Sequence, residues 1–177
     1  MNPIVWVCVF LFCAVFVFPF WKVNAKANYQ ISIDGFETNP NSDPAFVDYG
    51  DVHPSQKARN VFLIGGNFEL FKDVDNSYKA SYEVFLGENK KPMFTGSSGA
   101  CELLDNDHKI MQRLRQVSNF PERGVCPMTS GKYKIDNYEV EESQLPAILP
   151  KGKYKLVLVV KKDDTVKAGF TIHVTVK

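Results

Sequence analysis

The sequence contains few of the side chains on which enzymes usually depend. Its three histidines are scattered: His53 lies in a polar stretch, His108 in the first turn of a predicted helix, and His173 on the outward side of a predicted strand. No nucleophile elbow, zincin motif or Cys-x-x-Cys pair is present. We therefore expect a protein that is not an enzyme, with no catalytic residues, no metal site and no cofactor.

The run Asp105-Asn106-Asp107-His108 could be drawn as a metal-binding cluster. However, acidic and amide side chains at the start of a helix also cap its free N–H groups and complement its dipole. Capping explains the run without a metal, and we favour that explanation.

The chain also lacks an excess of charge of either sign. It has 21 Lys and Arg against 20 Asp and Glu, which gives a formal net charge of +1. Proteins that bind nucleic acid need positive charge to neutralise phosphates, so no nucleic-acid partner is expected. The sequence has no Asn-x-Ser/Thr acceptor either, so no N-linked glycan is expected.

The N-terminus is an almost unbroken apolar run over residues 4–21, followed by Val23 and Ala25, which are small enough for a signal-peptidase site. The run lacks a preceding Lys or Arg and is close to the length that spans a bilayer, so a retained anchor is the alternative. We expect residues 1–25 to be a signal peptide and residues 26–177 to be one secreted, extracellular domain.

Cysteine is scarce once that segment is set aside. Cys8 and Cys13 belong to the signal, which leaves Cys101 and Cys126. In an oxidising compartment two such cysteines are expected to pair rather than to serve as reactive thiols.

Strand-like alternation of apolar and polar residues dominates the rest of the chain. Gly65-Gly66 interrupts one alternating stretch and predicts a bulge or the close approach of another backbone. Residues 78–86 are expected to form a hairpin with that stretch, residues 37–58 a long polar loop with a short strand near 46–49, and residues 96–99 a flexible loop at whose end no helix begins. The predicted strands are 29–34, 61–71, 78–86, 92–95, 133–138, 154–160 and 166–176, the last two joined by a turn at 162–165.

One helix is predicted at about 105–118, because Ile110, Met111, Leu114 and Val117 share one face. Asp105 or Asn106 would cap it, and the two cysteines flank it. The pattern predicts an all-β fold of two packed antiparallel sheets, with six to eight strands and this single helix.

Several short motifs occur in a fixed order in the C-terminal half: Cys126-Pro127, Gly131-Lys132-Tyr133, and Leu149-Pro150-Lys151-Gly152-Lys153-Tyr154 before the last hairpin. In this order they resemble the ML lipid-recognition superfamily, and within it the ganglioside-activator-like branch with its insect secreted, chemosensory-B-type relatives. The resemblance covers residues 101–177. It implies an immunoglobulin-like β-sandwich whose sheets enclose a lipid. The ganglioside activator has several disulfides, whereas only one is available here.

The inward parity of the predicted strands is rich in aromatic residues, which are large and rigid. Such residues either pack on one another as a solid core or line an apolar cavity, and the resemblance favours the cavity. Its rim would be formed by Leu145, Ile148 and Leu149 with Phe120. The full set of lipid-cavity candidates is Phe62, Ile64, Phe68, Leu70, Tyr82, Val84, Met93, Phe94, Met111, Leu114, Phe120, Tyr133, Ile135, Leu145, Ile148, Leu149, Tyr154, Leu156, Leu158, Phe170 and Ile172.

These observations predict a secreted carrier of a lipid or another hydrophobic small molecule, with a cuticular hydrocarbon or pheromone as the ligand in a chemosensory variant. A membrane surface or a receptor protein is a further candidate partner. The alternative is a closed sandwich that acts as an extracellular protein-interaction module. The polar loop at 37–58 and the outward side chains of Phe85, Val157 and Val159 would form its contact surface.

Overall fold

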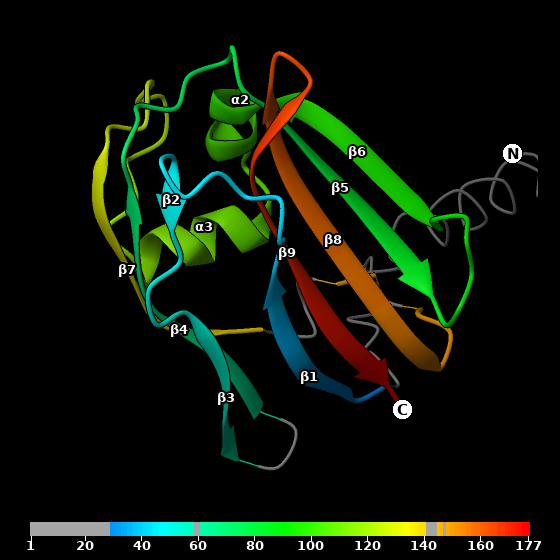
Figure 1. Cartoon of the computed structure of the whole chain (residues 1–177). Helices are drawn as coiled ribbons and strands as arrows, with labels where there is room; N and C mark the ends of the chain where they lie inside the picture. Colours follow the sequence, from blue (N-terminus) through cyan, green and yellow to red (C-terminus); the bar gives the residue numbers. More distant parts are fainter. Residues whose placement is uncertain (1–28, 59–60, 141–144, 147) are drawn as a thin grey trace, which may run out of the picture.

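The computed structural model describes residues 29–58, 61–140, 145–146 and 148–177. The N-terminal segment, for which a signal peptide was predicted, lies outside them. The described residues form nine strands and two helices (Figure 1). The elements are β1 (Ile31–Thr38), β2 (Val47–Asp48), β3 (His53–Ala58), β4 (Val61–Leu70), β5 (Lys79–Leu86), β6 (Phe94–Gly99), α2 (Ala100–Asp105), α3 (Lys109–Gln116), β7 (Gly131–Glu139), β8 (Gly152–Lys162) and β9 (Thr165–Val176).

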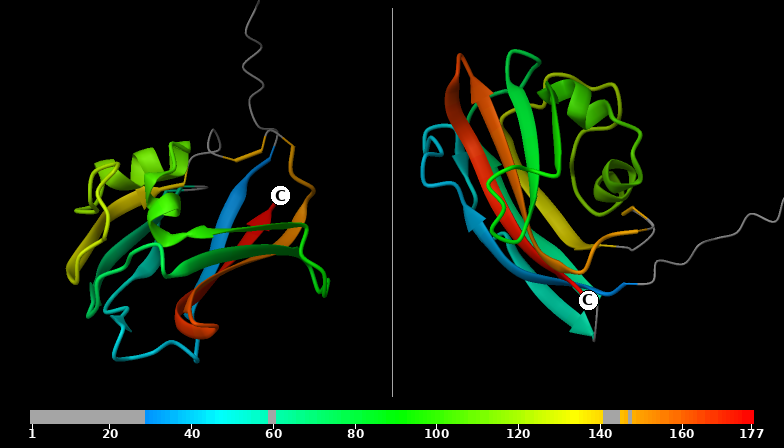
Figure 2. Two further views of the ribbon diagram at one scale, coloured as in Figure 1. Left: turned by 90° about the horizontal axis from the view of Figure 1, so that it is seen from above. Right: turned by 90° about the vertical axis from the view of Figure 1, so that its right-hand side faces the viewer.

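The strands build two antiparallel sheets, which confirms the all-β sandwich. One has five strands in the order β1-β9-β8-β5-β6, and the other contains β2-β4-β3 with β7 paired to β4. Both helices lie on one side of the five-stranded sheet, towards β7 (Figures 1 and 2). The nine strands exceed the predicted six to eight because the segment predicted as a polar loop contains an additional strand, β3.

The β8–β9 hairpin agrees with the prediction from alternation. Its turn consists of Asp163 and Asp164, whose φ angles are 51° and 58°. Two central residues with positive φ match the right-handed twist of the flanking strands, and Asp tolerates that conformation better than most residues. The pairing runs from Lys162 and Thr165 to Gly152 and Val176.

The neighbour predicted for β5 is wrong. This strand pairs with β6 and β8 in the five-stranded sheet, whereas β4 belongs to the other sheet. Alternation tells which side of a strand faces the core but not which strand lies beside it. The turn between β4 and β5 therefore carries the chain from one sheet to the other instead of closing a hairpin.

Residues 96–99, predicted as a flexible loop, are the last four of the six residues of β6, and α2 begins directly after them. Both predictions for this segment are therefore wrong. Glycine weakens a strand because it offers no side chain to pack. Here the ring of Tyr82 on β5 occupies the space above Gly96, where a methyl group would collide with it. The aromatic neighbour supplies the packing that the glycine lacks.

The prediction of a long polar loop at 37–58 is partly wrong as well. A short strand near 46–49 was expected and is present as β2, but β3 was missed and β1 continues to Thr38. β3 is polar and contains Pro54, which usually argues against a strand. It lies at the edge of its sheet, where a missing N–H donor is tolerated.

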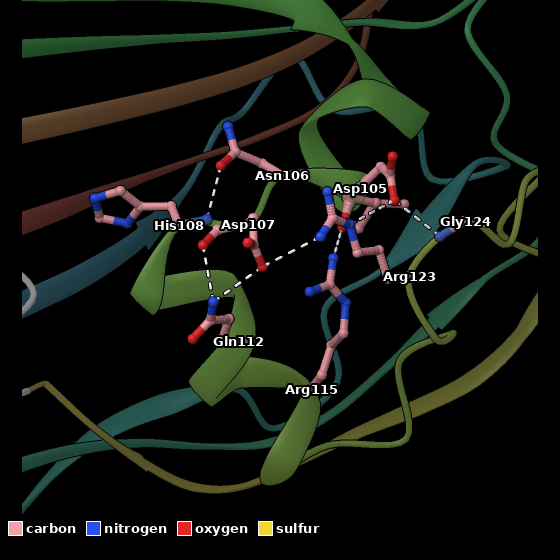
Figure 3. A network of polar contacts seen from close by, with 9 residues as sticks. Asp105, Asn106, Asp107, His108, Gln112, Arg115, Arg123 and Gly124 are labelled. Atoms are coloured by element: carbon pink, nitrogen blue, oxygen red, sulfur yellow. Dashed lines mark hydrogen bonds and ion pairs between the residues drawn. The ribbon is translucent and has the colours of Figure 1, made fainter.

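The prediction of a single helix at 105–118 is partly wrong: α3 lies within that range, but a separate helix, α2, precedes it and ends at Asp105 (Figure 3). The N–H of His108 donates to the side-chain oxygen of Asn106 at 2.8 Å, and His108 Nδ1 accepts from the N–H of Ile110 at 3.3 Å. These side chains satisfy backbone groups locally and so compete with a continuous helix. His108 therefore caps α3, in place of the predicted Asp105 or Asn106, and Asn106 follows the last residue of α2.

Hydrogen-bonded aspartates tie loops to strands and make stability sensitive to acid. Asp51 accepts from the N–H of Asn67 at 2.5 Å, and Asp73 accepts from the N–H of Ser130 at 2.7 Å. These backbone donors hold the pKa of both carboxyls below the usual value. A lowered pKa in the folded state contributes stability above the unfolded pKa of about 4, and that contribution is lost as pH falls through the folded value.

We therefore expect the free energy of unfolding in urea to fall steadily from pH 4 to pH 2. Asp73→Asn keeps an oxygen for Ser130 but removes the titrating charge, so the variant should lose part of this dependence while differing less from wild type at pH 2 than at pH 6. Equal pH slopes for the wild type and the variant would contradict the assignment.

Candidate functional site

One face of the five-stranded sheet is apolar across its whole width. Directly paired residues of an antiparallel ladder lie on the same face, so the register assembles rows across the strands. Tyr82, Leu158 and Phe170 form one row, and Val84, Leu156 and Ile172 the next. We call this the inner face. Its apolar members are Ile31, Ile33, Phe36, Ala80, Tyr82, Val84, Leu86, Phe94, Tyr154, Leu156, Leu158, Val160, Ala168, Phe170, Ile172, Val174 and Val176.

A first cluster of buried residues joins the inner face to the other sheet at one end. Val160 and Ala168 of the five-stranded sheet pack there against a cluster that includes Leu70 and Tyr133 from β4 and β7. Phe120 meets the rings of Phe68 and Tyr133 edge-on, at centroid distances of 5.8 and 5.7 Å. The sandwich is therefore closed at this end by interlocked side chains. The buried members of the cluster are Phe46, Val47, Leu70, Val74, Tyr78, Ala100, Met128 and Tyr133.

A second, smaller cluster covers the opposite end of the inner face. It consists of Tyr29, Tyr154 and Val176, and two apolar residues of the loop after β7, Leu145 and Leu149, pack on it. The hydroxyl of Tyr29 donates to the carbonyl of Pro146 at 2.6 Å, which fixes part of that loop over the sheet.

Between the two clusters, the described residues leave the inner face partly uncovered. We call the rows of Tyr82–Leu158–Phe170 and Phe94–Leu156–Ile172, with Phe36 at their edge, the open band. Tyr82 and Phe94 remain 40% and 48% exposed, and the other members are half-buried. No side chain in the described part of the chain is fully buried. Sheet faces of this composition are normally covered by a partner sheet, so the open band is an unusually accessible apolar surface.

The open band carries no charge. From the Ile31–Val176 row to the Val160–Ala168 row, no Asp, Glu, Lys or Arg lies on the inner face. Its few polar groups are small ones, such as Thr38 and Ser98, and the hydroxyl of Tyr82. An exposed apolar surface of this extent favours an apolar ligand over a polar one.

Two surface depressions lie elsewhere on the molecule. One, of about 500 Å³, is lined by Asp34, Gly35, Glu37, Lys153, Tyr154, His173, Val174 and Thr175. The other, of about 340 Å³, is lined by Asp43, Ala45, Phe46, Lys72, Tyr78, Lys162, Asp163, Thr165 and Lys167. Neither contains a member of the open band. An enclosed lipid cavity thus remains a prediction, while the observed apolar surface is open.

The run Asp105 to His108 has partners within the protein. The carboxylates of Asp105 and Asp107 each lie 3.4 Å from the guanidinium of Arg123, and Asp105 also accepts from the N–H of Gly124 at 2.9 Å (Figure 3). The side chains of Asn106 and His108 accept hydrogen bonds from backbone N–H groups between the two helices and at the start of α3. These side chains fasten the turn between the two helices to the following loop.

The predicted pairing of Cys101 with Cys126 is confirmed, with 5.8 Å between the two Cα atoms. Cys101 lies in the first turn of α2, and Cys126 precedes a cis peptide bond to Pro127. Two residues further on, Met128 bridges to Val74 and belongs to the first cluster. The disulfide therefore anchors the start of the helical segment to the closed end of the sandwich.

The two Gly-x-Tyr motifs form the same local structure twice. The hydroxyl of Tyr133 donates to the carbonyl of Thr129 at 2.6 Å, and that of Tyr154 to the carbonyl of Pro150 at 2.7 Å. Each motif opens with a glycine at positive φ, 148° for Gly131 and 152° for Gly152. Burial raises the pKa of the Tyr154 phenol. Both tyrosines therefore pin the loop in front of a strand, which is a structural role.

A family model described as Protein of unknown function (DUF1091) matches residues 67–156, which is 90 of the 177 residues. The chain belongs to the DUF1091 family. The match runs from β4 into β8 and so includes the disulfide, both described helices and both Gly-x-Tyr motifs of this DUF1091 protein. No curated protein matches the chain. Neither of the DUF1091 protein's two described helices is long and apolar enough to cross a membrane.

The structure distributes the predicted cavity residues over distinct parts of the DUF1091 protein. Those on the inner face are Tyr82, Val84, Phe94, Tyr154, Leu156, Leu158, Phe170 and Ile172. Those on the four-stranded sheet are Phe62, Ile64, Phe68, Leu70, Tyr133 and Ile135. Met111 and Leu114 lie on α3, and Met93 is exposed just before β6. Of these, Leu70, Tyr133 and Tyr154 are buried in the two clusters and build the closed ends.

The predicted rim is divided. Leu145 and Leu149 lie on the second cluster, whereas Ile148 between them is 88% exposed. Phe120 packs in the first cluster at the other end and does not accompany this loop. The rim residues were grouped by sequence composition, which does not show that two apolar segments cover opposite ends of one face.

Phe36 was missed as a member of the open band. Its ring contacts that of Phe170 in a tilted arrangement, at a centroid distance of 5.4 Å. A bulge between Ile33 and Gly35 shifts the alternation of β1, so Phe36 faces inward although its parity differs from that of Ile33. Gly35 is the sequence signal that could have revealed the shift.

Proposed function

We propose that this DUF1091 protein is a secreted carrier that binds a lipid or another apolar small molecule against the open band. The observation that carries the proposal is the uncovered middle of the inner face, uncharged and bracketed by two packed clusters. Covering such a surface with an alkyl chain gains about 0.8 kcal/mol per buried methylene. A long alkyl chain would therefore bind with few polar contacts.

The ordered motifs support the same proposal. Cys126-Pro127, the two Gly-x-Tyr motifs and the Leu-Pro-x-Gly-x-Tyr run resemble the ML lipid-recognition superfamily, ganglioside-activator-like branch, in which a splayed sandwich holds a lipid. The disulfide is consistent with an extracellular protein. In the chemosensory-like variant of this function, the ligand would be a cuticular hydrocarbon or pheromone.

The competing function is a protein-interaction module that uses the outer face of the same sheet. Phe85, Val157 and Val159 are half-buried there. The ammonium of Lys155 lies 4.8 Å from the centre of the Phe85 ring and partly covers it. The outer face is therefore a more polar surface than the open band, and we favour the carrier.

The carrier function is tested by binding of N-phenyl-1-naphthylamine, a neutral apolar fluorophore, to the delipidated secreted protein. Leu158→Lys places a charge in the open band and is expected to weaken binding at least about 10-fold, because a charge is costly to bury in an apolar site. Val157→Lys is the matched control. It adds the same charge one residue away on the outer face and should bind as wild type does.

Thermal unfolding and circular dichroism of both variants would establish that they are folded. Organic extraction and mass spectrometry of the undelipidated protein should also release an apolar molecule. The proposal is wrong if the wild-type protein takes up no fluorophore and releases no such molecule, or if both lysine variants bind as well as wild type.

A further inference from the structure

Arg113 differs from the two neighbouring arginines, Arg115 and Arg123, in having a buried N–H group without an acceptor. Arg123 lies between two carboxylates, and Arg115 donates to the backbone carbonyl of Leu104 (Figure 3). Arg113 donates from Nη1 to the amide oxygen of Gln116 at 3.1 Å, and its Nε is shielded from solvent without any acceptor. Within the described ranges, no carboxylate lies at ion-pair distance from Arg113.

Helical spacing places Arg113 beside a partly exposed apolar stripe. Ile110, Arg113, Leu114 and Val117 follow one another at i, i+3, i+4 and i+7, which brings them to one side of α3. No residue of α3 is buried, although Leu114 and Arg113 are half-covered. The helix lies on the same side of the five-stranded sheet as β7 (Figures 1 and 2). The described residues thus leave its stripe partly exposed, with a guanidinium at its margin, on the side of the sheet that carries the inner face.

A half-buried guanidinium is poorly hydrated, and an N–H group left without an acceptor is costly. The planar fork of Arg matches the two oxygens of a carboxylate or phosphate. We propose that Arg113 binds the head group of the ligand, so that the ligand is an alkyl chain ending in an anionic oxygen group. This inference rests on the proposed carrier function, and it names the chemical class of the ligand.

The test compares ligands of one chain length that differ only in the head group. Dodecanoic acid and dodecanol each displace N-phenyl-1-naphthylamine from the full-length secreted protein at pH 8, where the acid is ionised. The wild type is expected to bind the acid roughly 10-fold more tightly than the alcohol, because its carboxylate accepts a charge-assisted hydrogen bond from the guanidinium that the alcohol cannot match. Dodecyl phosphate in the same assay distinguishes a phosphate head from a carboxylate head.

Arg113→Met keeps an apolar stem and removes the charge, so it should lose the preference for the acid while its affinity for dodecanol stays within about twofold. Lys132→Gln is the control, because it removes one positive charge from an 82% exposed side chain on the outward side of β7 and should keep the preference. Arg113→Gln serves in place of the methionine variant if that variant does not fold, which uptake of the neutral fluorophore would show.

The outcomes separate the two proposals. Equal binding of acid and alcohol by the wild type, or an unchanged preference in a folded Arg113 variant, would overturn the head-group assignment and leave the carrier function standing. If the wild type bound none of the fluorophore, the acid, the alcohol and the phosphate, both the head-group assignment and the carrier function would be overturned.

Discussion

Replacement of Gly66 by alanine is expected to lower the free energy of unfolding by about 3–5 kcal/mol. Gly66 has a φ of 126°, which L side chains rarely adopt, and a Cβ there would lie 2.5 Å from the carbonyl oxygen of Asp51 and 2.7 Å from the Cα of Val52. Backbone strain costs about 1–3 kcal/mol and overpacking about as much again. Both colliding atoms belong to the backbone, so a change of rotamer cannot relieve the contact.

Gly87→Ala is the matched control for this prediction. Gly87 also has a positive φ, 60°, but a Cβ there meets no atom within 4 Å. Gly87→Ala should therefore lower the free energy of unfolding only by the conformational penalty of about 1–2 kcal/mol. Urea denaturation of the two variants separates strain from collision. Equal losses would show that the approach of residues 51 and 52 to β4 is not what requires the glycine.

Gly65-Gly66 shows what the sequence could reveal about the fold. The pair predicted a bulge or a close backbone approach, and both are present: the β4–β7 register shifts there, and the segment before β3 crosses Gly66. The hairpin of β8 and β9 was equally accessible because its alternation is long and its turn short. Both features could be predicted because each depends on the residues of a single short stretch of the sequence.

Non-local features were less accessible. β5 alternates as a strand must, yet nothing in its own residues says that it pairs with β8 rather than β4. β3 is a strand because the edge of β4 offers it hydrogen bonds, although its own composition is that of a loop. The break between α2 and α3 depends on side-chain bonds of Asn106 and His108, which outweigh an apolar periodicity that continues through them.

The candidate site divides in the same way. Parity correctly placed Tyr82, Leu158 and Phe170 on one face, because direction along a strand is a local property. Parity could not tell whether that face is covered. The answer depends on where the loop with Leu145 and Leu149 ends and where the first cluster begins. The open band is the part of the inner face that lies between the two clusters, and each cluster is formed by a different segment of the sequence.

Removal of the disulfide is the second change expected to have a large effect. Cys101 and Cys126 are separated by 25 residues, and closing a loop of that length restricts the unfolded chain by about 3 kcal/mol in the chain-entropy model. Cys101→Ser with Cys126→Ser should therefore lower the free energy of unfolding in urea by about that amount. Reduction of the wild-type protein should have a similar effect, and the same reductant should leave the double variant unchanged.

The disulfide closes the loop that contains both helices, whereas the open band lies on β5, β6, β8, β9 and β1. The double variant should therefore bind the neutral fluorophore nearly as well as wild type at temperatures where it is folded. Its preference for dodecanoic acid over dodecanol should fall, because α3 and its Arg113 lose an anchor at the closed end of the sandwich. A large loss of fluorophore binding in the folded variant would place the apolar site on the helices instead of on the sheet.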